Sequence, residues 1–439
     1  MLEYDFKNQE IADIVNTMII YAVSQKASDI HFDPFEDGVK VRFRIDGVLQ
    51  IHTIVPLVYQ RNLITRIKLI SNMNITESRL PQDGAIKGSI NGIDLDMRVS
   101  TLNTNLGEKV VIRILDYTKS SDGLESLGFS KDNLEKVKKM IQVPNGIVLI
   151  TGATGSGKST TTYTMLKELN TEDVNIITVE DPIEMNIEGV NQIQVNSEIG
   201  LTFGRVLRSI LRQDPNIILI GEIRDTETAQ IAVRASITGH LVLSTIHTNN
   251  SLSTIERLLD MDVERYLLSS AITGIVSQKL ARRICQHCKV ERETTAYEKE
   301  VFKRTLGKEV TKVLDHGPGC EHCRNGYSGR IAIQEVLLIN DEIRNAINDE
   351  NMPREELKKM VYTKDVTTLL QDGLNKVLDG ITSFEEIYKL VEIDNELDNL
   401  YDSEIGSKID KNLEKQEEAL LEKKADQFEK TEILDLNGI

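Results

Sequence analysis

The sequence predicts an α/β fold class, with a smaller α+β domain before the main sheet and a metal-binding, helical region after it. Three observations in the 439-residue chain lead to this prediction. Two hairpin signals fall within the first 118 residues, short apolar runs alternate with helical patterns over residues 131–284, and two Cys-x-x-Cys pairs follow. A chain of this length is expected to form two or three domains.

The first 118 residues carry the signals of a small α+β domain. Apolar residues at helical spacing predict a helix within residues 1–26. Strand patterns flank Asp46-Gly47 and Asn91-Gly92, and each predicts a hairpin because these dipeptides favour tight turns. A helix is expected over residues 57–73 and a further strand over 109–115. The serines and glycines of residues 119–130 predict a linker.

The central region alternates strands with helices. Apolar runs at residues 146–151, 174–179, 216–221 and 241–246 predict four strands. This alternation predicts a mainly parallel sheet, in which ligands bind beyond the carboxyl ends of the strands. The residues that follow these four strands are therefore the candidates for function.

The first strand end carries a phosphate-binding pattern. Gly152, Gly157, Lys158 and Ser159 satisfy G-x-x-x-x-G-K-[ST], between an apolar strand and a helical segment. The glycines let backbone N–H groups point at phosphates, the lysine adds a cation, and the serine offers a hydroxyl to Mg²⁺. A glycine-rich turn without a ligand is the alternative, which this context disfavours. The predicted nucleotide-binding residues are Gly152, Ala153, Thr154, Gly155, Ser156, Gly157, Lys158, Ser159 and Thr160.

Two further strand ends carry acidic residues. Glu180 and Asp181 follow the second strand. Glu222 follows the third, where Gly221 takes the place of the aspartate usual in a Mg²⁺-binding Walker B strand. Glu222, together with Ser159, is therefore the candidate on the metal side, and Glu180 is the candidate that orients or deprotonates the attacking water. The two glutamates can exchange these roles, and the sequence does not separate them.

A histidine and several arginines complete the candidate set. His247 follows the fourth strand, where it is placed to sense a γ phosphate, and a structural histidine is the alternative. Phosphoryl transfer often also uses an arginine. The N-terminal domain offers Arg42, Arg44, Arg98 and Arg113 on predicted strands, where an exposed ladder residue is the simpler interpretation.

Two Cys-x-x-Cys pairs, separated by 31 residues, predict a metal site at residues 285–325. In a cytosolic protein this pattern favours a metal over disulfides, and four thiolates suit a closed, structural Zn²⁺ site. Free buried cysteines, a redox pair and an iron–sulfur cluster are the alternatives. The predicted ligands are Cys285, Cys288, Cys320 and Cys323.

The composition narrows the class of protein further. No apolar run reaches the roughly 18 residues of a membrane-spanning helix, and no signal peptide is visible, so a cytosolic protein is expected. The net charge of −17 disfavours nucleic acid as a partner, although a local basic groove can hide within that total. Residues 392–439 contribute 6 Lys and 15 Asp or Glu, or 6 − 15 = −9. This acidic tail predicts a solvated helix, with a partner-binding helix as the alternative.

Over residues 27–391 the chain resembles the secretion ATPases of type II secretion and type IV pilus assembly. The motifs that carry this resemblance are Ala27-Ser28-Asp29-Ile30-His31, Arg42-Phe43-Arg44-Ile45-Asp46-Gly47, Arg79-Leu80-Pro81-Gln82-Asp83-Gly84, the loop from Gly152, Thr178-Val179-Glu180-Asp181-Pro182-Ile183-Glu184, Leu211-Arg212-Gln213-Asp214-Pro215, Gly221-Glu222-Ile223-Arg224-Asp225, Thr238-Gly239-His240 and His247-Thr248-Asn249.

The resemblance implies a fold and a working assembly. It implies a PAS-like domain at residues 1–118, a RecA-like P-loop ATPase core at 131–284, a zinc module at 285–325 and a helical region at 326–391. It also implies a homohexamer at the cytoplasmic face of the inner or plasma membrane, which uses ATP, Mg²⁺ and Zn²⁺. Such a ring drives an inner-membrane platform protein, through which it associates peripherally with the membrane.

The resemblance also assigns roles to residues. Arg98 and Arg113 match the arginines that reach the nucleotide from the small domain. His247 matches a γ-phosphate contact, and Glu222 matches a catalytic or Mg²⁺-linked acid. The four-cysteine module is typical of assembly motors, whereas the related retraction motors usually lack it.

Two features depart from the family pattern. Many members carry an additional N-terminal domain that docks to a membrane partner or binds a cyclic dinucleotide, and this chain begins almost at the second domain. The acidic tail is also outside the pattern. An assembly motor is the leading hypothesis, and a retraction motor, a nucleic-acid translocase and a non-enzymatic nucleotide-binding scaffold are the alternatives.

Overall fold

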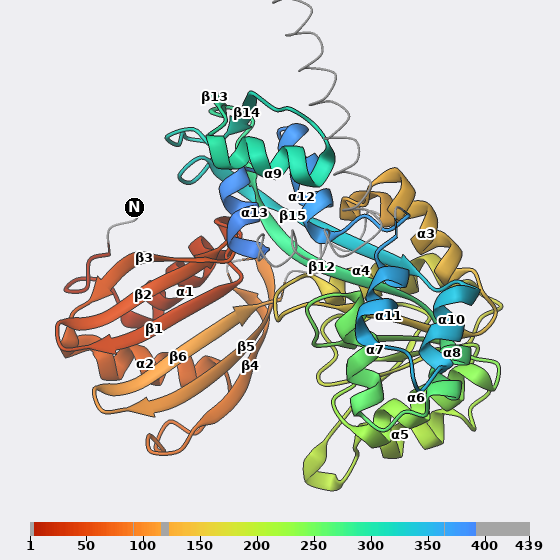
Figure 1. Ribbon diagram of the computed structural model, residues 1–439. Coiled ribbons are helices and arrows are strands. Elements are labelled where there is room, and N and C mark those ends of the chain that lie inside the picture. Colours follow the sequence, from red (N-terminus) through yellow and green to blue (C-terminus); the bar gives the residue numbers. More distant parts are fainter. Residues whose placement is uncertain (1–3, 91, 116–122, 364, 392–439) are drawn as a thin grey trace, which may run out of the picture. The chain divides into compact units, whose positions relative to one another are not determined.

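The computed structural model describes residues 4–90, 92–115, 123–363 and 365–391 (Figure 1). The chain divides into two compact units, Met1–Lys119 and Ser120–Ile439, which are described separately. Residues 119–122 of the predicted linker and the whole acidic tail lie outside the described residues. Among the described residues, no helix has the length and apolar character needed to cross a membrane.

The N-terminal unit is a six-stranded sheet with helices on one face. Its strands lie in the order β3-β2-β1-β6-β5-β4, and neighbouring strands are antiparallel. Its elements are α1 (Ile11–Ser24), β1 (Asp29–Phe35), β2 (Gly38–Ile45), β3 (Val48–Val55), the 3-10 turn η1 (Leu57–Tyr59), α2 (Gln60–Ile70), β4 (Gln82–Ile90), β5 (Ile93–Thr104) and β6 (Gly107–Ile114). The core forms where alternate strand residues, such as Ile30 and Phe32, pack with α1 and α2.

Most of the elements predicted in this unit are present. The hairpin at Asp46-Gly47 is confirmed by the pairing of β2 with β3. The second predicted hairpin is also confirmed, because β4 pairs with β5 up to Ile90 opposite Ile93; its Asn91 lies outside the described residues. The helix expected over residues 57–73 is shorter, since it starts with η1 and ends at Ile70.

The second unit is built on a seven-stranded sheet in the order β15-β12-β7-β11-β10-β8-β9. The pairs from β12 to β9 are parallel, and β15 is antiparallel to β12. The strands are β7 (Gly146–Thr151), β8 (Ile176–Glu180), β9 (Asn191–Gln194), β10 (Ile217–Ile220), β11 (Leu241–Ile246), β12 (Ile272–Ile284) and β15 (Tyr327–Leu338). Parallel register brings the carboxyl ends of β7, β8, β10 and β11 to one edge of the sheet.

Helices cover both faces of this sheet, as Figure 1 shows. Ile147 and Leu149 of β7 belong to one core and Val148 and Ile150 to the other, because successive strand residues point to opposite faces. One core contains η3 (Leu124–Leu127), α3 (Lys131–Ile141) and α4 (Lys158–Leu169). The other contains α5 (Phe203–Ile210), α6 (Thr226–Ile237), α7 (Ser251–Asp260), α8 (Arg265–Ala271), α10 (Asp341–Asn348) and α11 (Arg354–Val361). The turn η4 (Ser197–Ile199) precedes α5.

The region after the core differs from the prediction in one respect. Residues 326–391 were expected to be helical, but they begin with β15, which pairs with β12 along most of its length. A fourth core joins these two strands to the helices that follow. The remaining elements are β13 (Val290–Glu293), α9 (Ala296–Leu306), β14 (Lys312–Asp315), α12 (Leu369–Leu378) and α13 (Phe384–Leu390). The helix α9 lies between the two cysteine pairs and begins with a Thr295–Glu298 capping box.

Candidate nucleotide site and metal centre

The phosphate-binding loop connects the buried strand β7 to the first turn of α4. Gly157 has φ +91° and Lys158 is the first residue of the helix. Backbone N–H groups of the loop and the positive end of the helix therefore face the same space, which is the arrangement that binds phosphate. Ser159 and Thr160 are exposed at this helix start.

Two contacts with β12 fix the shape of the loop. A Cβ atom at Gly152, where φ is +147°, would lie 2.4 Å from the carbonyl oxygen of Gln278. The buried amide of Gln278 donates to the carbonyl oxygen of Ser156 at 2.9 Å and accepts from Thr161 Oγ1 at 2.9 Å. Only glycine fits at position 152, because the loop backbone packs directly on the neighbouring strand.

Lys158 lies folded into the loop. Its Nζ donates to the carbonyl oxygens of Gly152 at 2.8 Å and Ala153 at 3.1 Å. Burial lowers the pKa of the ammonium group, and the negative charge of Glu222 opposes that shift. The cation and the acid therefore belong to one electrostatic site, as expected for a lysine that reaches the phosphates of a nucleotide.

Glu222 is the centre of a charged cluster beyond β10. Its side chain is 14% exposed, and it forms an ion pair with Arg224 and a 3.3 Å contact with His247 Nε2. Arg224 also approaches Asp181 at 3.6 Å. The cluster therefore brings residues from the ends of three neighbouring strands together.

A glycine stands before Glu222 for a steric reason. A Cβ atom at Gly221 would lie 3.2 Å from the Cα atom of Glu180 and 3.4 Å from the carbonyl oxygen of Val179. The Gly221 N–H donates to that same carbonyl at 2.8 Å. The end of β10 is thus packed tightly on the end of β8, and a side chain at this position would require the end of β8 to shift by a few tenths of an ångström.

Glu180 has a different environment from Glu222. It is 3% exposed, and its carboxylate accepts hydrogen bonds from three side chains. These donors are the Tyr163 hydroxyl, Thr178 Oγ1 at 2.6 Å and Gln192 Nε2 at 3.0 Å. Burial, followed by the charge of Glu180 and the hydrogen bond to it, raises the pKa of the Tyr163 phenol. In this structure the lone pairs of Glu180 are largely engaged.

The loop that carries His247 is tied down at several points. Thr151 Oγ1 donates to the carbonyl oxygen of Thr248 at 2.8 Å, and Glu335 on β15 accepts from the Ser251 N–H at 2.9 Å. His247 itself is 49% exposed at the side chain. His240, by contrast, contacts the carbonyl oxygen of Ala235 at 2.9 Å, which is a local structural role.

The candidate arginines lie in the N-terminal unit, on the sheet face opposite α1 and α2. Arg98 on β5 and Arg113 on β6 stand directly opposite each other. Arg42 donates through Nε to Asp33 at 2.7 Å, and Arg44 donates through Nη1 to the carbonyl oxygen of Gly47 at 2.8 Å.

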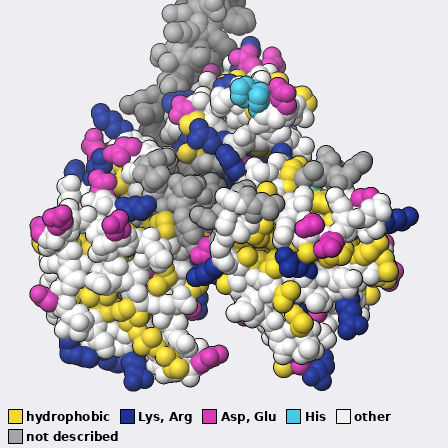
Figure 2. Space-filling view, turned by 180° about the vertical axis from the view of Figure 1, so that it is seen from behind, with side chains coloured by type: hydrophobic (Ala, Val, Ile, Leu, Met, Phe, Trp, Pro, Cys, Tyr) yellow, Lys and Arg dark blue, Asp and Glu magenta, His cyan; other side chains and the backbone are white. Residues whose placement is uncertain are grey.

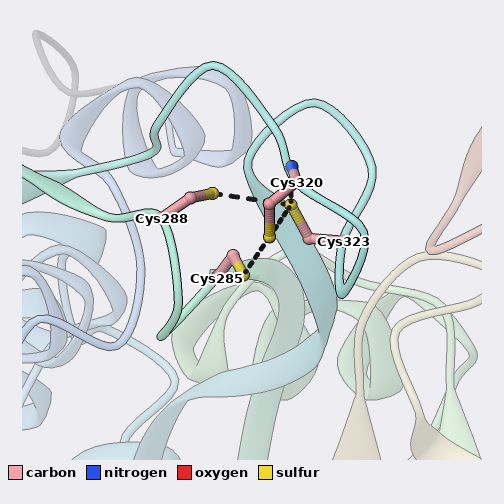
Figure 3. A group of neighbouring side chains, drawn as sticks. All are labelled: Cys285, Cys288, Cys320 and Cys323. Carbon is pink, nitrogen blue, oxygen red and sulfur yellow. Dashed lines mark hydrogen bonds between the residues drawn. The ribbon is translucent and has the colours of Figure 1, made fainter.

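The four cysteines converge on one point, as Figure 3 shows. One pair follows β12 and the other precedes β15. The Sγ atoms of Cys285 and Cys320 are 3.8 Å apart, those of Cys288 and Cys323 are 3.5 Å apart, and those of Cys320 and Cys323 are 3.6 Å apart. A tetrahedral Zn²⁺ with bonds of about 2.3 Å requires sulfur–sulfur edges of about 3.8 Å. The donor set and its spacing therefore fit a structural zinc ion held by four thiolates.

The fold and the loop define a P-loop ATPase with a RecA-like core. Residues 5–389 match the family model described as Type II/IV secretion system protein. The chain therefore belongs to this family.

Individual relatives are similar over most of the chain. The type II secretion system protein E of Pectobacterium carotovorum subsp. carotovorum is 46% identical, with 87% of this chain and 75% of that protein covered. The type IV pilus assembly ATPase PilB of Thermus thermophilus is 47% identical, with 85% of this chain and 42% of that protein covered.

Solved structures share the fold. The pilus retraction motor PilT with bound ADP is 27% identical and superposes with a TM-score of 0.60, covering 87% of this chain and 98% of its own. The Legionella pneumophila ATPase DotB is 22% identical with a TM-score of 0.66, and the match covers 88% of this chain and 97% of DotB.

Several residues of the site were not predicted from the sequence. Tyr163 and Gln192 bind Glu180, Arg224 binds Glu222, and Gln278 supports the loop. Arg224 follows Glu222 by two residues in the sequence, and this short spacing of opposite charges is a signal from which the ion pair could have been predicted. The other three come from helices and strands whose packing the sequence pattern does not specify.

Proposed function

We propose that this chain is an ATP-hydrolysing motor that powers assembly of a type IV pilus or a type II secretion pseudopilus. One observation supports this most strongly: the loop at Gly152, the buried Lys158 and the Glu222–His247 pair occupy adjoining strand ends in a member of this family. Relatives named as type II secretion protein E and as a pilus assembly ATPase support the same function.

The proposed roles of the residues follow from their surroundings. Backbone N–H groups of residues 152–160 bind the phosphates of ATP, and Lys158 neutralises their charge. Ser159 and Glu222 hold Mg²⁺ directly or through water. His247, which is beside Glu222 and half exposed, contacts the γ phosphate. Bound Mg²⁺ supplies charge neutralisation for phosphoryl transfer.

The two glutamates are proposed to share the handling of the attacking water. Glu222 is partly exposed beside His247, whereas Glu180 is buried behind three hydrogen-bond donors. We therefore assign Glu222 the more direct role in this state, and Glu180 a role that requires it to exchange one of those donors. Arg98 and Arg113 are proposed to contribute positive charge to the bound nucleotide.

Membership of the family supports a proposal for the assembly. We propose a homohexamer at the cytoplasmic face of the membrane that drives an inner-membrane platform protein. The four-cysteine centre, loaded with zinc, closes the end of the β12–β15 hairpin and has a structural role. No nucleic acid is expected as a partner.

The assignment of Glu222 is tested with purified full-length chain. Glu222→Gln is expected to bind ATP with little change and to hydrolyse it about 100-fold or more slowly, because the variant loses a carboxylate beside the metal and the water. Glu227→Gln is a matched control, since Glu227 is a half-exposed acid nearby that pairs with Arg208 on the surface. Undiminished turnover by Glu222→Gln would refute the site assignment.

Three further outcomes separate the alternatives. A strain without this chain is expected to make no fibres, whereas excess fibres would indicate a retraction motor. Strong stimulation of ATPase activity by DNA would indicate a translocase. Within each of the two units, the face shown in Figure 2 carries both basic and acidic side chains among the described residues. Absence of turnover even with the platform protein would indicate a scaffold.

A further inference from the structure

A row of charged side chains crosses four neighbouring strands of the N-terminal sheet. Arg44 on β2 is opposite Asp29 on β1, which is also opposite Arg113 on β6, and Arg113 is opposite Arg98 on β5. Directly opposed residues share a face of the sheet, so three guanidinium groups and one carboxylate lie side by side. Because Ile30 and Phe32 belong to the core, this row is on the face away from α1 and α2.

The carboxylate of Asp29 is held in a fixed orientation. Asp29 is 7% exposed, and each of its oxygens has a partner. Oδ1 accepts from Arg113 Nε at 3.1 Å, and Oδ2 accepts from Ser28 Oγ at 2.8 Å. Arg44 Nε is 3.7 Å from Oδ2. A buried carboxylate with these partners is a rigid anchor for the arginine beside it.

The pairing of Arg113 with Arg98 is unfavourable in a sheet. Like charges directly opposite each other destabilise a strand pair, and Asp29 of the same row supplies a negative charge to Arg113. Asp29 contacts Arg113 through Nε, the guanidinium nitrogen nearest the backbone. A guanidinium held at Nε still presents its two terminal nitrogens to a phosphate, and the Arg113 side chain is 58% exposed.

We propose that Asp29 is the positioning residue for Arg113 and fixes the rotamer from which its guanidinium acts on the nucleotide. The inference rests on the proposed function, in which Arg113 contributes charge to that nucleotide. Asp29 fixes the rotamer of the arginine in advance, so less side-chain freedom is lost when the arginine contacts the phosphate in the transition state. Asp29 itself touches no reacting atom.

Asp33 provides a matched control on the same strand and the same face. Asp33 is 5% exposed and also holds two cations, because it accepts from Arg42 and pairs with Lys109. Lys109 stands opposite Leu102 rather than a second cation. Asp33→Asn therefore removes the same charge from an equally buried position without a contact to Arg113.

The test compares variants of the full-length chain by their kcat and KM for MgATP and by their Tm. Asp29→Asn is expected to lower kcat by about 10-fold or more with KM within about twofold, because a misoriented group loses its effect mainly in the transition state. Asp33→Asn is expected to change kcat less than about threefold, although its Tm is expected to fall by about as much as that of Asp29→Asn. Asp29→Glu retains the charge but moves it by one methylene, and it is expected not to restore kcat.

The double variant Asp29→Asn with Arg113→Ala separates the role of Arg113 at the nucleotide from the role of Asp29 in positioning Arg113. Its kcat is expected to equal that of Arg113→Ala alone, because Asp29 acts through that arginine. Wild-type kcat in Arg113→Ala would refute the proposed role of the arginine. A lowered kcat in Arg113→Ala together with an unchanged kcat in Asp29→Asn would refute only the positioning role of Asp29. Equal kcat losses in Asp29→Asn and Asp33→Asn, or a full additional loss in the double variant, would indicate a merely structural role.

Discussion

Replacing Gly152 by alanine tests the contact between the phosphate loop and β12. A Cβ atom there would lie 2.4 Å from the carbonyl oxygen of Gln278 and 2.5 Å from Ser156 Oγ, at a φ of +147°. The strained backbone costs about 1–3 kcal/mol, and the close approach costs about 1–3 kcal/mol more. A loss of about 2–6 kcal/mol is therefore expected, which corresponds to a Tm lower by about 4 °C or more.

A second glycine of the same loop, Gly155, provides the comparison that separates the steric cost from the backbone cost. Gly155 has φ +80°, but a Cβ atom there meets nothing within 4 Å. Gly155→Ala is therefore expected to lose only the backbone cost of about 1–2 kcal/mol. Urea unfolding of both variants without nucleotide gives the comparison. Equal losses in the two variants would refute the argument that packing on Gln278 dictates glycine at position 152.

Two other predictions concern the metal centre and a buried acid. Cys288→Ser is expected to lower bound zinc well below one ion per chain and to reduce the Tm, as measured by metal analysis and calorimetry; unchanged zinc would exclude Cys288 as a ligand. Glu335 is fully buried, and burial raises the pKa of its carboxyl. Its contribution to stability is therefore present below the unfolded-state pKa and is lost as pH rises through the folded-state pKa. Glu335→Gln keeps the acceptor for the Ser251 N–H, so its stability relative to wild type is expected to increase in urea unfolding as pH rises above the unfolded-state pKa of the glutamate. A difference that does not change with pH would contradict this.

The fold was predictable where the signal is local. The strands at residues 146–151 and 241–246 have the predicted bounds, because each is a fully buried apolar run between polar segments. The strands β12 and β15 were missed, since they pair with each other across the whole zinc module. Their sequences mix apolar and basic residues, and only the distant partner strand reveals that they belong to the sheet.

The positions of the candidate residues at the strand ends were predictable, whereas the side chains that surround them were not. Glu222 and His247 were placed at neighbouring ends of a parallel sheet, and the structure brings them to 3.3 Å. The burial of Glu180 was not predictable, because its three donors come from α4, β8 and β9. A motif gives the residue type at a position, but the donors around a carboxylate depend on tertiary packing.

The strand β12 connects the two chemical centres of the second unit. Gln278, near its middle, holds Ser156 and Thr161 of the phosphate loop and the helix that follows it. Six residues further on, about 20 Å along an extended strand, β12 ends at Ile284, directly before the first cysteine ligand. The cysteine centre joins this end of β12 to the start of β15, and β15 pairs back along β12 past Gln278. A zinc ion held there would keep this end of the hairpin from fraying, and it would therefore stiffen the same strand on which the loop packs. This arrangement gives a physical reason why a structural metal in the cysteine centre would support a phosphate site with which it shares no ligand.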